Sequence, residues 1–248
     1  MKKGLFIFVG ESFRTGGQFS RIKGLPESYD DQKLASESHV KIVKRISEDH
    51  GVDPEIKILT YPTQYIQDLA KWYDGFNTNI YVYQEPIGYS NLISEAVNRI
   101  EEEYEFVFFI RIDLILKSDL TKLIKKDKIN YSTVCFFYNN YHKIGYLHRV
   151  ADLMLYIPSE FIPNLKSREI QLHHDSIAFL GEKCRNSVDF LLDTYHDSDS
   201  QKDRNPLYRI AGRPEVDSWY SEGYRLGPDP ISDESKTYEE VFKNEYTL

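Results

Sequence analysis

FVFFIRIDLIL, residues 106–116, is the most strand-like stretch of the chain. Its first five residues are apolar, which is typical of a strand buried on both faces of a sheet. We expect the strand to span Glu105–Asp113 and to carry Arg111 and Asp113 near its end. Because these two residues are two positions apart, the alternation of a strand directs both side chains to the same face. The stretch is therefore the first candidate site.

The segments before this stretch alternate between strand and helix patterns. We predict strands at Leu5–Val9, Glu55–Tyr61 and Asn79–Tyr83, and helices at Asp31–His50, Thr63–Trp72 and Ser90–Glu103. In the first of these helices, Leu34, Val40, Val43 and Ile46 recur at helical spacing and are expected to be buried. The alternation implies an α/β fold with a central, mostly parallel sheet flanked by helices.

The segments after this stretch are less regular. We predict strands at Ser132–Tyr138 and Asp152–Ile157, and helical pieces at Ser159–Leu165, His174–Leu180 and Ser187–Leu192. No linker separates two parts of the chain, so we expect a single domain over residues 1–248, with a polar tail over about 226–248.

Composition excludes several classes of protein. The chain has 248 residues, of which 41% are hydrophobic and 14% aromatic, so it is not of the aromatic-poor kind that stays disordered. Its 31 basic and 39 acidic residues give a net charge of −8, whereas proteins that bind nucleic acids are usually basic. We therefore expect no nucleic-acid partner.

The two cysteines and the apolar runs bear on the compartment. Cys135 and Cys184 form no CxxC pair, so we expect buried thiols rather than a zinc site or a disulfide. No run reaches the roughly 18 apolar residues of a membrane span. We expect a cytoplasmic protein without a membrane span. The sequence does not reveal its oligomeric state.

Two interpretations of Arg111 and Asp113 are open. The two side chains could satisfy each other as a structural ion pair, because a buried charge is costly unless it is compensated. Alternatively, Asp113 holds Mg²⁺ or Mn²⁺, whose preferred ligands are oxygen atoms, while Arg111 contacts an anionic ligand.

The loop after the first strand is a second candidate site. Gly10-Glu-Ser-Phe-Arg14-Thr-Gly16-Gly17 combines glycines, which let backbone N–H groups approach a phosphate, with an arginine. Its spacing is not that of a P-loop. The alternative interpretation is a polar turn with solvated arginines.

The order of these elements and the stretch FVFFIRIDLIL resemble glycosyltransferases of the GT-A fold, a Rossmann-like architecture. That family carries an Asp-x-Asp motif at the end of the corresponding strand, where it binds a metal and the diphosphate of a nucleotide sugar. Here Arg111 replaces the first acidic residue. Such an Arg-x-Asp variant is similar to small transferases of bacterial polysaccharide clusters and of large DNA viruses, which for a viral protein implies the host cytoplasm.

The resemblance implies a metal-assisted glycosyltransferase that uses a nucleotide-diphosphate sugar and a glycan or other hydroxyl acceptor. The nucleotide-sugar half would cover about residues 1–117 and the acceptor half about 118–225. Ser12, Arg14, Arg111 and Asp113 would contact the donor, and Asp113 with His174 would hold Mn²⁺ or Mg²⁺.

An inverting enzyme of this kind also needs a base for the acceptor hydroxyl. Asp152 and Asp175 are the candidates by their order in the chain, although Asp175 also suits a helix N-cap and Asp152 could pair with Arg149. Trp219 and Tyr220 are candidates for stacking on the acceptor sugar.

Two alternatives to this function remain open. Phe13-Arg-Thr-Gly-Gly17 faintly resembles the phosphate loop of sulfotransferases, which use a nucleotide sulfate and no metal. The chain could also be a non-catalytic glycan-binding module of the same fold.

Overall fold

The computed structural model describes residues 2–13, 28–85, 87–101, 103–116, 120–132, 134–135, 149–150, 154–170, 180–191 and 208–210. The strands of the main sheet are β1 (Lys3–Val9), β2 (Asp53–Thr60), β3 (Asn77–Val82), β4 (Phe106–Arg111), β6 (Ile129–Tyr131), β9 (Met154–Pro158) and β10 (Val188–Phe190). Two short antiparallel pairs accompany it: β5 (Leu114–Leu116) with β11 (Tyr208–Ile210), and β7 (Val134–Cys135) with β8 (Arg149–Val150).

The helices are α1 (Ser28–His50), α2 (Ile66–Trp72), α3 (Tyr89–Asn98), α4 (Ile162–Lys166) and α5 (Glu182–Arg185), with 3₁₀ turns η2 (Leu120–Lys122) and η3 (Ser159–Phe161). None of the helices in the described ranges is both long and apolar enough to cross a membrane.

The seven strands of the main sheet lie in the order β10-β6-β9-β4-β1-β2-β3. Neighbouring strands are parallel except at β9, which runs against both β4 and β6. The described part of the chain therefore has the α/β architecture that the sequence predicts, a mostly parallel sheet flanked by helices.

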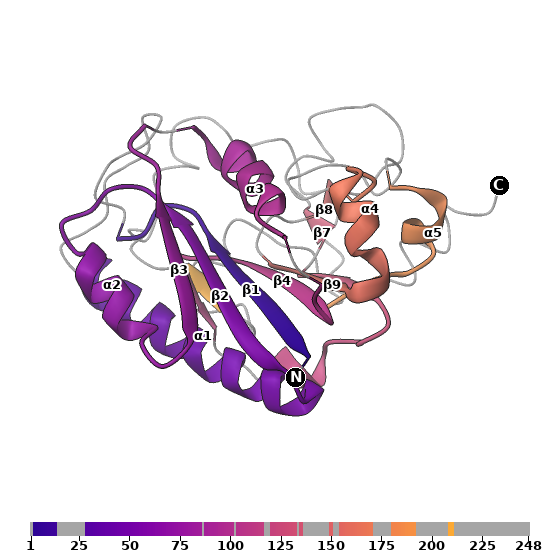
Figure 1. The fold of residues 1–248 in the computed structure, drawn as a ribbon, viewed down its shortest axis with the longest axis horizontal. Helices are drawn as coiled ribbons and strands as arrows, with labels where there is room; N and C mark the ends of the chain where they lie inside the picture. Colours follow the sequence, from indigo (N-terminus) through magenta and orange to yellow (C-terminus); the bar gives the residue numbers. More distant parts are fainter. Residues whose placement is uncertain are drawn as a thin grey trace, which may run out of the picture.

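Helices cover both faces of the sheet (Figure 1). Successive residues of a strand point to opposite faces, so each strand contributes side chains to the core on either side. Phe6 and Phe8 of β1 join the core with α1 and α2, whereas Leu5, Ile7 and Val9 join the core with α3, α4 and α5. The sheet is thus buried on both faces, which explains why β1 and β4 are continuous apolar runs.

Gly4 in β1 has a packing reason. A Cβ atom built on it would lie 2.5 Å from the ring of Phe106 in the neighbouring strand, so no larger residue fits without a shift.

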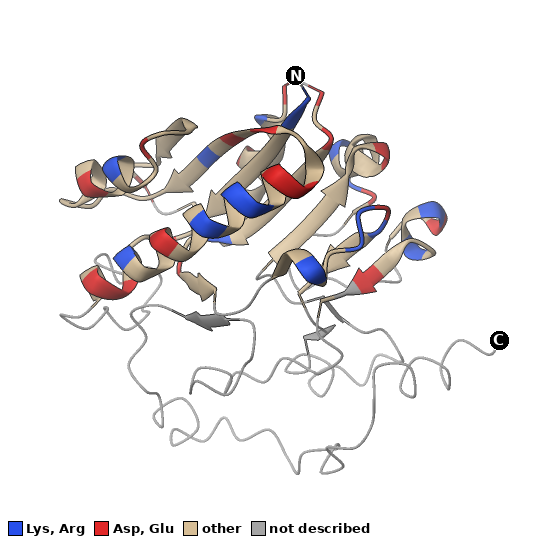
Figure 2. Cartoon of the chain, turned by 90° about the horizontal axis from the view of Figure 1, so that it is seen from below, with Lys and Arg blue, Asp and Glu red and all other residues tan. Residues whose placement is uncertain are grey.

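Helix α1 corrects one prediction of the sequence analysis. Leu34, expected in the core, is 47% exposed, whereas His39 and Gln32 are buried on the same face as Ile42 and Val43. Figure 2 shows the outer side of α1 carrying both positive and negative charges. The buried stripe of α1 therefore includes polar residues, which matters for the site described below.

The second half differs more from the predictions. The helix predicted over Ser187–Leu192 is wrong, because Val188–Phe190 forms the edge strand β10, paired in parallel with β6. The strand predicted over Ser132–Tyr138 is confirmed at Val134–Cys135 only: Ser132 follows β6, which ends at Tyr131, and residues 133 and 136–138 lie outside the described residues. Of the helical piece predicted over His174–Leu180, only Leu180 lies within the described residues.

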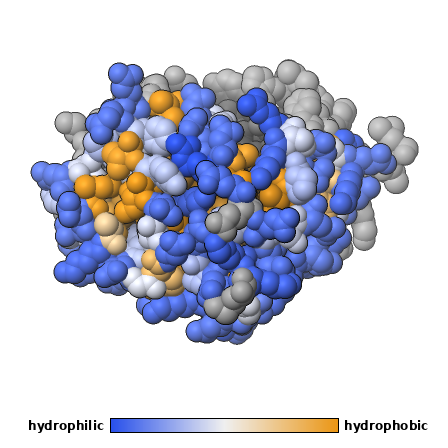
Figure 3. Space-filling view, viewed as in Figure 1, coloured by the Kyte–Doolittle hydropathy of each residue, from blue (hydrophilic) through white to orange (hydrophobic). Residues whose placement is uncertain are grey.

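The surface of the described residues has few large apolar groups. Figure 3 shows a mainly hydrophilic face on which groups of apolar side chains are also visible. Among the described residues, the exposed large hydrophobic side chains are Leu34, Val82 and Leu123, which lie on different elements. Single exposed apolar residues are normal on a soluble surface and indicate no docking face.

The order of strands creates a switch point beside β1. The chain passes from β1 to β2 and β3 on one side, and then returns to place β4 on the other side of β1. In open α/β sheets, ligands bind beyond the carboxyl ends of the strands at such a point. The carboxyl ends of β1 and β4 are therefore where a functional site is expected.

Candidate site at the switch point of the sheet

The carboxyl ends of β1, β2 and β4 lie level with one another. Val9 is the register partner of Arg111, and its carbonyl accepts a hydrogen bond from the Ile112 N–H at 3.0 Å. The Gly10 N–H donates to the carbonyl of Leu59 at 3.1 Å. The segments that follow these three strands thus begin at one edge of the sheet.

Arg111 and Asp113 meet at this edge in a bidentate ion pair. Arg111 Nε donates to Asp113 Oδ1 at 3.0 Å, and Arg111 Nη2 donates to Asp113 Oδ2 at 2.6 Å. Both side chains are largely buried, with exposures of 12% and 7%. The guanidinium carbon also lies 6.0 Å from the ring centre of Tyr89, the first residue of α3.

The strand itself is shorter than predicted. β4 ends at Arg111, and Asp113 lies in the turn that leads to β5. The two side chains nevertheless point toward each other, so the turn replaces the strand alternation that the sequence analysis expected. This geometry is the ion pair that was one of the two interpretations of Arg111 and Asp113.

Ser12, which is predicted to contact the nucleotide sugar, is buried and hydrogen-bonded within the protein. Its hydroxyl lies 2.9 Å from the Thr60 hydroxyl at the end of β2, and its N–H donates to the same oxygen at 3.1 Å. These bonds fix the first loop against β2. A direct contact of the Ser12 hydroxyl with a ligand stays a prediction.

Phe13 anchors the same loop through its ring. It is a non-glycine residue with φ of 59°, in the left-handed region that large side chains rarely adopt. Its ring packs among Tyr29, Tyr65 and Trp72, with ring centres 5.2 to 5.7 Å away. This packing explains how the backbone conformation is held, and it makes Phe13 a core residue rather than part of an open phosphate loop.

Gln32 of α1 joins the two site segments. The Phe13 N–H donates to Gln32 Oε1 at 3.1 Å, and Gln32 Nε2 donates to the Ile112 carbonyl at 2.9 Å. One buried amide therefore ties the loop after β1 to the turn after β4.

His39 holds the far side of the turn. Its Nε2 lies 2.8 Å from the Leu114 carbonyl, and its Nδ1 lies 2.7 Å from the Tyr73 hydroxyl. Because a carbonyl only accepts, Nε2 carries the hydrogen and Nδ1 accepts from Tyr73. Burial lowers the pKa of His39 to about 3, so the ring is neutral at pH 7. Burial also raises the pKa of Tyr73, which keeps its hydroxyl protonated as a donor.

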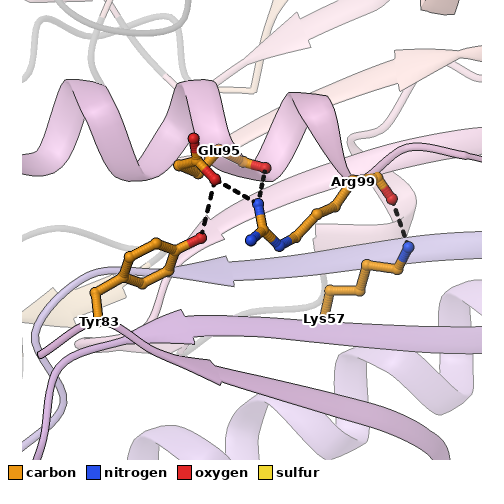
Figure 4. Close-up of polar contacts among 4 residues, drawn as sticks. All are labelled: Lys57, Tyr83, Glu95 and Arg99. Carbon is orange, nitrogen blue, oxygen red and sulfur yellow. Dashed lines mark hydrogen bonds and ion pairs between the residues drawn. The ribbon is translucent and has the colours of Figure 1, made fainter.

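A second buried ion pair lies away from the switch point, on the sheet face that α3 covers. Lys57 Nζ lies 3.5 Å from Glu55 within β2, and Glu55 also lies 3.8 Å from Lys3 of β1. Lys57 further donates to the carbonyl of Arg99, which closes the carboxyl end of α3 (Figure 4).

Arg99 continues this network toward the surface. Its Nη1 donates to Glu95 Oε2 at 2.6 Å, and Tyr83 donates to the same oxygen at 3.3 Å (Figure 4). The guanidinium also lies 4.7 Å from the ring centre of Tyr81. Some of these contacts lie within one element, as between Glu95 and Arg99, and others join two elements, as between Lys57 of β2 and the Arg99 carbonyl at the end of α3, which indicates a structural role.

Several predicted site residues lie outside the described residues. They are Arg14, Asp152, His174, Asp175, Trp219 and Tyr220. Their roles, and the division into a nucleotide-sugar half and an acceptor half, stay predictions.

The described side chains do not form a metal site as they stand. Both carboxylate oxygens of Asp113 accept hydrogen bonds from Arg111, which is itself a cation. Among the described residues, no three His, Cys, Asp or Glu side chains come together as metal ligands. A metal at Asp113 therefore requires that Asp113 leave Arg111, and the second predicted ligand, His174, is outside the described part.

Sequence reasoning missed Gln32, His39 and Tyr89. The signal for the first two is their spacing: Gln32 and His39 are seven residues apart, two turns of one helix face, and Ala35 and Ile42 share that face. Polar side chains within an apolar stripe indicate that something buried needs hydrogen bonds.

Comparisons with known proteins show fold-level similarity at most. No protein-family model and no curated protein matches the chain. Solved structures with a partly similar trace include a 4-diphosphocytidyl-2C-methyl-D-erythritol synthase from Anaerococcus prevotii, with 12% identity over 77% of this chain and 86% of that chain (TM-score 0.44).

Two others are glycosyltransferases. The galactosyltransferase LgtC, solved with donor and acceptor sugar analogues, has 9% identity over 86% of this chain and 87% of that chain, with a TM-score of 0.41. GlyE of Streptococcus pneumoniae has 11% identity over 78% of this chain and 46% of that chain, with a TM-score of 0.41. At such low similarity, the assignment of function depends on the chain's own residues.

Proposed function

We propose that this chain is a glycosyltransferase that takes a sugar from a nucleotide-diphosphate donor and passes it to a hydroxyl group of a glycan or another acceptor. The observation that carries the proposal is the position of the Arg111–Asp113 pair at the switch point of the sheet. That point is where open α/β sheets bind their ligands.

The charge of Arg111 suits this donor. Transfer of the sugar leaves a nucleoside diphosphate, whose negative charge grows as the glycosidic bond breaks. A guanidinium presents donors in a planar fork that matches phosphate oxygens, and it stays protonated at any relevant pH. We therefore assign to Arg111 the stabilisation of the leaving diphosphate, with Asp113 orienting its guanidinium.

The first loop supports the same site. Ser12 and Phe13, the residues immediately before Arg14 in the sequence, are fixed against β2 and α1. We propose that Arg14 contacts the nucleotide. We propose that Ser12 fixes the geometry of this loop through its bonds to Thr60. The predicted contact between Ser12 and the nucleotide sugar would be an additional role.

The remaining roles are proposals from the sequence. Asp175 or Asp152 would accept the proton of the acceptor hydroxyl, which a base must take as the new bond forms. A divalent metal held by Asp113 and His174 is a separate proposal, because it requires Asp113 to exchange its partner. The chemistry that such a metal supplies is neutralisation of the diphosphate.

A thermal-shift titration tests the proposal. UDP, GDP, CDP and adenosine 3′,5′-diphosphate are each added with Mn²⁺ and with EDTA. A ligand that binds only the folded state stabilises it by about 2.7 kcal/mol at a hundredfold excess over Kd. We expect one nucleoside diphosphate to raise the Tm.

Each other outcome has a defined meaning. A shift that requires Mn²⁺ supports the metal proposal, and an equal shift in EDTA contradicts it. A shift with the adenosine compound alone supports a sulfotransferase. The absence of any shift contradicts a nucleotide-dependent enzyme and leaves the non-catalytic module.

A further inference from the structure

Gln32 contacts both segments of the candidate site and belongs to neither. Its amide oxygen accepts from the Phe13 N–H at 3.1 Å, and its amide nitrogen donates to the Ile112 carbonyl at 2.9 Å. The side chain is buried on α1, two turns before His39. Phe13 immediately precedes Arg14, and Ile112 lies between Arg111 and Asp113.

We propose that Gln32 is a positioning residue that holds the loop after β1 and the Arg111–Asp113 turn at the spacing that a bound diphosphate requires. The inference deepens the proposed function and, in its ligand-binding part, rests on it. Gln32 does not touch the ligand. It acts through the backbone of Phe13, at the end of the described part of the first loop, and of Ile112, which lies between Arg111 and Asp113.

The amide group of Gln32 indicates a role in hydrogen bonding rather than in filling space in the core. Burying an amide costs free energy unless the amide is hydrogen-bonded, whereas a methionine of similar size would fill the same space without that requirement. The Gln32 amide bonds to two backbone groups, one in each site segment.

The strained backbone at Phe13 supports the same conclusion. Phe13 has φ of 59°, and the bond from its N–H to Gln32 is one of the contacts that hold this conformation, together with the ring packing. Residues held in sparsely populated backbone regions are common at functional sites, where the surroundings fix them.

A second residue of α1, His39, also bonds to the turn after β4. His39 binds the Leu114 carbonyl, so α1 holds the carbonyl groups on both sides of Asp113. The Leu116 N–H donates to the Ser38 hydroxyl on the same helix. Of these tethers, Gln32 is the one that also reaches the first loop.

The test compares two substitutions with a control. Gln32→Met keeps the volume and removes both hydrogen bonds. Gln32→Glu has a carboxyl group that, when protonated, can accept from Phe13 and donate to Ile112, as the amide does. Lys57→Met breaks a buried contact away from the site and controls for loss of stability.

The first readout is the affinity for the nucleoside diphosphate identified in the thermal-shift titration, relative to the unsubstituted protein at each pH. We expect Gln32→Met to bind about 10-fold or more weakly, since small misplacements of binding groups have effects of this size or larger. Lys57→Met should bind normally. Near pH 8, Gln32→Glu should resemble Gln32→Met, and toward pH 6 it should recover, because burial favours the protonated carboxyl. Equal losses in Gln32→Met and Lys57→Met, or no pH-dependent recovery, would overturn the proposal.

The second readout needs no ligand. Hydrogen exchange of backbone amides in Gln32→Met should accelerate in both 11–13 and 112–116, and not in β2, β3 or α3. Acceleration in only one of the two segments, or throughout the chain, contradicts a link between them. If no nucleotide binds the unsubstituted protein, the proposed function fails, and this exchange pattern still decides whether Gln32 couples the two segments.

Discussion

Two buried ion pairs in this chain have the same spacing and different surroundings. Arg111 with Asp113 and Lys57 with Glu55 each join a cation to a carboxylate two residues away, and their side chains are similarly buried. Lys57 and Glu55 lie within β2, and they also contact Arg99 and Lys3. Arg111 and Asp113 lie where β4 ends, at the switch point of the sheet.

The comparison shows that topology, rather than residue type, separates a structural pair from a candidate site. Lys57 and Glu55 are buried within a strand, and their partners are all protein groups. A charge at the carboxyl end of a central strand is where open α/β sheets place ligands. Substitutions at the two pairs should therefore differ in their effect on ligand affinity.

Arg111→Met should have the largest effect, because it removes the cation at the proposed binding site. We expect the affinity for the nucleoside diphosphate to fall about 100-fold, or about 2.7 kcal/mol. The stability of the fold should also fall by about 3 kcal/mol, since the buried Asp113 loses the guanidinium that bonds both of its carboxylate oxygens. Calorimetric titration and urea denaturation measure the two effects.

The double substitution Arg111→Met with Asp113→Leu separates these effects. Replacing both partners of a buried pair by apolar residues is often neutral for stability. The double variant should therefore recover stability and still bind weakly. If binding recovers with stability, Arg111 has only a structural role.

Lys57→Met should cost a similar amount of stability without any loss of affinity. It leaves Glu55 with Lys3 as a more distant partner and leaves the Arg99 carbonyl without its donor, so we expect a loss of about 3 kcal/mol. Urea denaturation measures this loss. A weakened affinity in this variant would show that the two ends of the sheet are coupled, contrary to the comparison.

His39 makes the site end of the sheet sensitive to acid. In the folded state the pKa of the His39 ring is about 3, so the ring is neutral at pH 7. In the unfolded chain its pKa returns to the ordinary value of about 6.5. Its contribution to stability is therefore complete above pH 6.5, and it is lost as the pH falls toward 3, at about 1.4 kcal/mol per pH unit.

His39→Phe tests this contribution, because it keeps the ring stacked on Phe8 and removes the titrating group. At pH 7 the variant should be less stable by about 2 kcal/mol, since the Leu114 carbonyl loses its donor. Between pH 6 and pH 4 its unfolding free energy should change less steeply than that of the unsubstituted protein. An identical slope in both proteins contradicts the assignment of a neutral buried ring.

Glu95→Gln should have the smallest effect. The hydrogen bond from Arg99 lowers the pKa of Glu95, but the pair is partly exposed and lies on a helix surface at i,i+4 spacing. Such pairs contribute about 0.5 kcal/mol or less. Urea denaturation in low and high salt checks this value, and a loss above about 2 kcal/mol would show that the network of Figure 4 acts as one unit.

The first half of the fold was predictable because its segments are long and strongly patterned. The strands β1 to β4 and helices α1 to α3 lie where the apolar periodicity indicated, with shifted ends. Val188–Phe190 was not predictable, because three residues at a sheet edge owe their conformation to pairing with β6. Short segments of this kind have no helix or strand period of their own to read.

The candidate site was predictable only in part. The sequence indicated that Arg111 and Asp113 would lie together, but the turn that brings them together depends on contacts from α1, which is 60 or more residues away in sequence. Gln32 and His39 look like ordinary polar residues on a helix until the burial of their face is known. Their seven-residue spacing indicates a shared helix face, but the residues that they bond to, 75 and 80 positions away, cannot be identified from a local pattern.

The residues that a bound nucleotide protects would show whether the ligand binds at the switch point of the sheet. Hydrogen exchange is followed for backbone amides while the protein is titrated with UDP, GDP and CDP in turn. We predict that one of them protects residues 10–13 and 111–114 and leaves β2 around Lys57 unchanged. Protection centred on the Lys57 network, or no protection by any of the three nucleotides, would contradict a nucleotide-sugar site at the switch point.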